Sequence, residues 1–172
     1  TPLGAVSIDR QAWLAARELP GVIVDDRPHA EEHAIEVQLP FLQSTLDHFE
    51  ILPVAVGQVD AHLVAGLLEA LWGGPETLIV ISSDLSHYHP YRQAQWRDKA
   101  TIGKIAQLDA TLDGEQACGA GAINGLLLAA QRHHLSPHLL DLRNSGDTAG
   151  DRDRVVGYAA LAFSEEHNHA HH

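Results

Sequence analysis

Short apolar runs that alternate with helical patterns dominate the hydrophobic pattern of the chain. Residues 77–81 form a β-branched apolar run, which predicts a fully buried strand. A second buried strand is predicted over 51–56, and an amphipathic helix over 61–72 lies between the two. Strand, helix and strand at this spacing suit a βαβ crossover and a largely parallel sheet.

The rest of the chain alternates in the same way. Asp9 has the character of an N-cap for a helix that Pro20 and Gly21 end. Apolar residues at helical spacing over 29–49 predict a helix that Pro40 kinks or divides. Further helices are predicted at about 91–108 and 123–130, and short strands at 5–8, 22–24, 139–142 and 155–163.

Composition narrows the class of protein. The 172 residues suit a single domain over 1–164 and a histidine-rich tail, 165–172, that we expect to be disordered. A formal charge of −12 argues against nucleic acid or an anionic membrane as the main partner. One cysteine excludes an intrachain disulfide framework, and no apolar run approaches the roughly 18 residues of a membrane span. We therefore expect a cytoplasmic protein, and the lack of methionine, even at position 1, indicates a processed, trimmed or partial chain.

The polar segment 82–89, Ser-Ser-Asp-Leu-Ser-His-Tyr-His, directly follows the predicted strand 77–81. Open α/β sheets bind ligands outside the carboxyl ends of their strands. Asp84 and His87 are three residues apart, so a turn would aim both side chains into one crevice, where the carboxylate fixes the imidazole tautomer. The alternative is a polar turn in which Asp84 caps the following helix.

Two other positions carry candidate chemistry. Glu32, His33 and Glu36 would share one face of the predicted helix, although most such patches are solvated surface. Cys118 lies near the start of an apolar helix, where the helix dipole favours a thiolate, but a lone cysteine is more often a small buried residue. The serine-hydrolase elbow, the Walker loop and paired zinc-binding motifs are absent from the sequence. The remaining imidazole, carboxylate and thiol groups suit either a redox-capable metal or a metal-free acid–base pocket.

Several motifs, in this order along the chain, resemble the MEMO family. They are Glu-His-Ala-Ile-Glu-Val-Gln-Leu-Pro at 32–40, Ser-Ser-Asp-Leu-Ser-His at 82–87, Cys-Gly at 118–119, Leu-Arg-Asn-Ser-Gly-Asp at 142–147 and Val-Gly-Tyr-Ala at 156–159. Within this family, the chain resembles the prokaryotic branch, the AmmeMemoRadiSam system protein B. The resemblance implies a three-layer α/β fold like that of class III extradiol dioxygenases, with a mixed, largely parallel central sheet and helices on both faces.

The resemblance also implies roles for residues. Cys118 would be an iron or copper ligand, His87 the acid–base histidine with Asp84 beside it, and His33 and Glu32 would line the pocket. The other two metal-binding histidines of the family belong to motifs upstream of Thr1. Three functions follow as alternatives: a dioxygenase-like oxidoreductase, a non-catalytic module that binds a peptide or small ligand in the same pocket, and a metal-free acid–base enzyme. A radical-SAM protein and an AMMECR1-like protein are the implied pathway partners.

Overall fold

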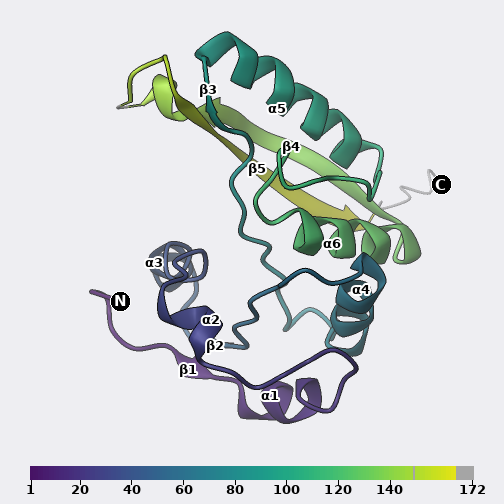
Figure 1. Ribbon diagram of the computed structural model, residues 1–172. Helices are drawn as coiled ribbons and strands as arrows, with labels where there is room; N and C mark the ends of the chain where they lie inside the picture. The colour runs from purple at the N-terminus through teal and green to yellow at the C-terminus, as the bar shows by residue number, and fades with distance from the viewer. Residues whose placement is uncertain (149, 166–172) are drawn as a thin grey trace, which may run out of the picture.

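The computed structural model describes residues 1–148 and 150–165, which form a mixed α/β structure with two small sheets (Figure 1). Strands β1 (Ser7–Ile8) and β2 (Glu50–Ile51) pair in parallel. Strands β3 (His87–His89), β4 (Leu135–Asn144) and β5 (Val155–Glu165) form an antiparallel sheet in the order β3-β5-β4. The helices of the described residues are α1 (Arg10–Ala16), α2 (Arg27–Ala30), α3 (Leu39–Thr45), α4 (Ala61–Ala70), α5 (Tyr91–Ala106) and α6 (Ala120–Arg132), with a 3-10 turn at Ser145–Asp147.

The hydrophobic core lies where α5 and α6 pack on one face of the antiparallel sheet. Ile105 of α5 and Leu127 of α6 are buried in it, together with Leu85 from the segment that leads into β3. Residues of β5 alternate along the strand: Val155 and Gly157 are buried, whereas their neighbours are more exposed. This alternation is typical of an antiparallel sheet that is covered on one face. Helix α4 packs against α6 in turn.

Local sequence signals explain several helix ends. Asp9 Oδ1 accepts a hydrogen bond from Ala12 N at 2.9 Å, so the predicted N-cap of α1 is confirmed. Asp60 caps α4 in the same way, through His62 N at 2.7 Å. Helices α4, α5 and α6 form close to the predicted ranges because their apolar stripes pack into the core.

The expected α/β class is confirmed, but the described residues form two small sheets and no large parallel central sheet. Among the described residues, parallel pairing is confined to β1 and β2, the larger sheet is antiparallel, and α5 and α6 pack on one of its faces. Residues 77–81 form no strand, and Leu78 and Val80 are 67% and 47% exposed. The predicted strand 51–56 pairs only at Ile51, and 22–24 does not pair. A β-branched run becomes a strand only where a neighbouring strand takes its backbone hydrogen bonds, and no described segment does so here.

The range predicted as a helix, 29–49, is divided as expected at Pro40, but it is less helical than predicted, because α2 and α3 are short and flank a turn at residues 34–38. Pro28 and Pro40 each occupy the first turn of their helix, α2 and α3. Proline is favoured in a first turn and breaks a helix interior, so each proline begins a new helix. Glu32, His33 and Glu36 therefore share no helix face.

The structure describes only the first residue of the predicted tail, 165–172. Glu165, placed in the tail by its sequence, is the last residue of β5, whereas the remainder of the predicted tail, 166–172, lies outside the described residues. Within residues 1–148 and 150–165, no helix combines the length and apolar character that a bilayer crossing requires.

Candidate functional site

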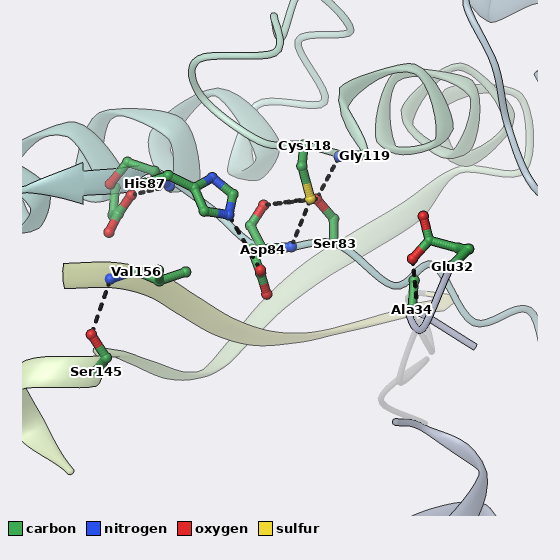
Figure 2. Close-up of polar contacts among 11 residues, drawn as sticks. Glu32, Ala34, Ser83, Asp84, His87, Cys118, Gly119, Ser145 and Val156 are labelled. Atoms are coloured by element: carbon green, nitrogen blue, oxygen red, sulfur yellow. Dashed lines mark hydrogen bonds and ion pairs between the residues drawn. The ribbon is translucent and has the colours of Figure 1, made fainter. Parts of the chain in front are cut away.

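An aspartate and a histidine face each other at the start of β3. The chain from residue 82 runs extended into β3, and His87 Nε2 lies 3.3 Å from Asp84 Oδ2, with 31% and 45% of the two side chains exposed (Figure 2). Helix α5 begins after Pro90 and has no side-chain cap. The alternative in which Asp84 caps that helix is therefore wrong, and the carboxylate instead orients the imidazole.

Cys118 lies beside the same aspartate. Its sulfur accepts a hydrogen bond from Asp84 N at 3.3 Å, and its own N–H donates to Asp84 O, also at 3.3 Å. The thiol is exposed and lies two residues before α6. Figure 2 shows the sulfur, the Asp84 carboxylate and the His87 ring in one row along the segment that enters β3. Three groups that are up to 34 residues apart in sequence thus lie at one edge of the antiparallel sheet.

Gly119 brings these two segments together. Its N–H donates to Ser83 Oγ at 2.8 Å, and Ser83 Oγ donates to Asp84 O at 2.7 Å. A Cβ at position 119 would lie 2.8 Å from Ser83 Cβ, which is closer than two carbon atoms can pack. The absence of a side chain at Gly119 therefore allows Cys118 to approach Asp84.

Tyr158 is a site residue that the sequence pattern did not single out. Leu85 N donates to Gly157 O, and Gly157 N donates to Ser86 O, both at 2.9 Å. Because these two antiparallel segments pair here, Asp84, which precedes Leu85, lies opposite Tyr158, which follows Gly157. Partial burial and then the charge of Asp84 raise the pKa of the Tyr158 phenol. The motif at 156–159 marked this segment, but only the strand pairing brings Tyr158 within range of the Asp84 charge.

The structure places the Glu32 carboxylate away from the Cys118 group. The Glu32 carboxylate accepts hydrogen bonds from Ala34 N and His33 N, at 2.8 Å each, and these bonds lower the pKa of Glu32. It lines a shallow hollow of about 510 Å³ with Arg27 and its neighbours, and Figure 2 shows it apart from the Cys118 group. Within the described ranges no hydrogen bond or ion pair joins the side chains of Glu32 or His33 to that group.

The donor set for a metal is incomplete in the part of the chain that the structure describes. No group of three or more histidine, cysteine, aspartate or glutamate side chains there is arranged to hold a metal ion. Cys118 and Asp84 are adjacent, but His87 lies on the far side of Asp84 from the sulfur (Figure 2). Because a tight site needs several ligands at fixed geometry, these residues alone do not fit iron or copper.

The fold and site define a mixed α/β protein with a partly exposed carboxylate–imidazole pair and a neighbouring exposed thiol at a sheet edge. Residues 1–162 match the Memo-like protein family, and the chain belongs to this family. It is 33% identical to a MEMO1 family protein of Metallosphaera sedula and 34% identical to one of Sulfolobus acidocaldarius. These alignments cover 96% of this chain but only 64% and 63% of the relatives, so the chain spans less than two thirds of their length.

Proposed function

We propose that Asp84, His87 and Cys118 are this chain's contribution to a metal pocket of the dioxygenase-related type, with Cys118 as a ligand for iron or copper. The observation that carries the proposal is the approach of the exposed Cys118 sulfur to within 3.3 Å of Asp84 N, next to the Asp84–His87 pair. Thiolate ligands suit soft or redox-active metals, which supports iron or copper over magnesium or calcium. The three-layer, class III extradiol dioxygenase-like fold belongs to the same proposal and concerns a longer polypeptide than the described residues.

The described side chains have separable roles in this proposal. Asp84 N–H holds the sulfur, and the Asp84 carboxylate fixes the orientation of the His87 ring. With Nε2 turned to Asp84, Nδ1 of His87 is the nitrogen that exchanges a proton with a bound ligand. Because the donor set in the described residues is short of a complete site, the remaining ligands come from polypeptide beyond these residues, and no reaction step is assigned to the metal.

Metal analysis of the longest form of the protein that its gene encodes tests this proposal. Residues 167–172 contain four histidines, so the measurements use a form without them. We expect about one iron or copper per chain, lost in Cys118→Ser and retained in His138→Ala, whose ring contacts Ser164 Oγ at 3.0 Å in β5. Stoichiometric metal in Cys118→Ser would overturn the assignment of the ligand.

A second candidate is a non-catalytic module that binds a peptide or small ligand at the same place. The incomplete donor set favours it, since Asp84 and His87 are exposed enough to contact a ligand directly. A phosphopeptide library, presented with and without a chelator, separates the two candidates. Binding that persists with the chelator and is lost in His87→Ala supports the module, whereas loss on chelation supports the metal pocket.

Neither candidate function identifies the proteins with which this protein acts. The family resemblance suggests a radical-SAM protein and an AMMECR1-like protein as partners, and we propose them as the first proteins to test by co-purification with the full-length product. Whether the pocket turns over a substrate is part of the same proposal, and oxygen consumption by the metal-loaded protein measures it.

A further inference from the structure

Asp98 is a buried carboxylate directly behind the site. It lies in α5, is 2% exposed and forms no ion pair with a described lysine, arginine or histidine. A carboxylate in such a place is costly unless hydrogen bonds compensate the lost water. Neither the sequence motifs nor the proposed pocket assigns this residue a role.

One hydrogen bond connects Asp98 to the site segment. Asp98 Oδ1 accepts from Ser86 N at 3.0 Å, across twelve positions of sequence. The carbonyl of the same residue, Ser86, accepts from Gly157 N at 2.9 Å. Both backbone groups of Ser86 are therefore held, one by α5 and the other by β5.

The neighbouring strand leaves room for this carboxylate. A Cβ at Gly157 would lie 2.6 Å from Asp98 Cγ and 2.9 Å from Oδ1, so any other residue at 157 would displace the group. Ser86 is 1% exposed, and its own hydroxyl has no hydrogen-bond partner in the part of the chain described. The Asp98 carboxylate is thus enclosed between α5, β5 and the 84–87 segment, with the Ser86 N–H as its donor.

We infer that Asp98 is a positioning residue for the Asp84–His87 pair. Only Leu85 and Ser86 separate the two paired residues, and the Leu85 N–H is bonded to Gly157 O at 2.9 Å. Fixing the Ser86 peptide sets the direction in which His87 leaves the backbone, and hence the 3.3 Å contact between its ring and Asp84. This inference rests on the proposed function only in taking that pair as the site, and it requires no metal.

Nuclear magnetic resonance of the His87 ring tests the inference, because nitrogen shifts report the tautomer and the contact with Asp84 without activity. Asp84→Asn gives the signature of a broken pair, and His87→Gln assigns the signal among the thirteen histidines. We expect Asp98→Ala to reproduce the Asp84→Asn signature, and Asp98→Asn, which retains the acceptor oxygen, to keep the wild-type one. Thr101→Ala is the matched control: Thr101 is equally buried in α5, but its hydroxyl bonds to Arg97 O at 3.2 Å within the helix.

Wild-type ring signals in Asp98→Ala would overturn the inference, as would a changed signature in Thr101→Ala. Unchanged His87 signals in Asp84→Asn would do the same, because the pair would then not be coupled. A second measurement uses the wild-type protein and so does not depend on the folding of a variant. The amide hydrogen of Ser86 should exchange with solvent at least about tenfold more slowly than the same amide hydrogen in an unfolded peptide. Exchange at the peptide rate would refute the bond.

Metal analysis of the same samples keeps the two proposals apart. If Cys118→Ser retains stoichiometric metal while Asp98→Ala changes the His87 signature, the metal assignment fails and the positioning role stands. If Cys118→Ser loses the metal while Asp98→Ala leaves the His87 signals unchanged, the metal assignment stands and the positioning role of Asp98 fails.

Discussion

The packing of Gly157 against Asp98 predicts that Gly157→Ala is among the most damaging single-methyl additions in the chain. The added Cβ would overlap the Asp98 carboxylate, which is 2% exposed and is held by Ser86 N. Adding a carbon to a packed interior costs about 1–3 kcal/mol. Displacing the Asp98 side chain also leaves the buried Ser86 N–H without its acceptor, which costs about 1–3 kcal/mol. We expect a loss of about 3–5 kcal/mol in the free energy of unfolding.

Urea unfolding followed by circular dichroism measures this loss. Gly103→Ala is the control, because Gly103 lies in α5 with nothing within 4 Å of its Cβ, and we expect it to gain about 0.5–1 kcal/mol. In an Asp98→Ala background the overlap no longer exists, so Gly157→Ala should cost less than about 1 kcal/mol there. A loss below about 1 kcal/mol in the wild-type background, or equal losses in both backgrounds, would refute the reasoning.

Three further predictions concern the core, a helix cap and pH. Leu127→Ala, at a fully buried position of α6, should lower the free energy of unfolding by about 2–5 kcal/mol in urea titrations. Asp9→Ala should cost about 1 kcal/mol in the same assay, because Ala12 N loses its acceptor, and Asp9→Asn should cost much less. The hydrogen bond from the Tyr91 hydroxyl lowers the pKa of Asp147, and the same bond raises the pKa of Tyr91. The wild-type protein should therefore exceed Tyr91→Phe in stability most clearly at pH values between the titration of Asp147 and that of Tyr91.

The sign of the pH effect follows from each pKa shift. The contribution of Asp147 is complete above its unfolded pKa of about 3.9 and is lost as pH falls through its lower folded value. That of Tyr91 is complete below its unfolded pKa of about 10 and is lost as pH rises through its higher folded value. A difference between wild type and Tyr91→Phe that stays constant from acid to alkaline pH would contradict the pairing. Stability of Leu127→Ala or Asp9→Ala equal to wild type would contradict the packing and the cap.

Three residues of the candidate site, Asp84, His87 and Cys118, could be singled out from the sequence, but the way in which they come together could not. Asp84 and His87 are three residues apart, so their spacing alone limits how far their side chains can separate. Cys118 was marked by its place before a helix, but its approach to Asp84 depends on Gly119 and Ser83 across the fold. The shared face of Glu32, His33 and Glu36 depended on a predicted helix that the structure replaces with a turn, and the pocket role of Glu32 and His33 rested on the family resemblance alone.

The sequence by itself determined what is decided within one or two turns of chain. The cap at Asp9, the periodic helices α4, α5 and α6, and the apolar runs that become β4 and β5 all depend on neighbours a few residues away. Only the tertiary structure decided which apolar runs found a strand partner, in which direction they paired, and that Asp98 and Tyr158 adjoin the site. Strand pairing and buried hydrogen bonds join residues far apart in the chain, and their free energy depends on a partner that no local pattern specifies.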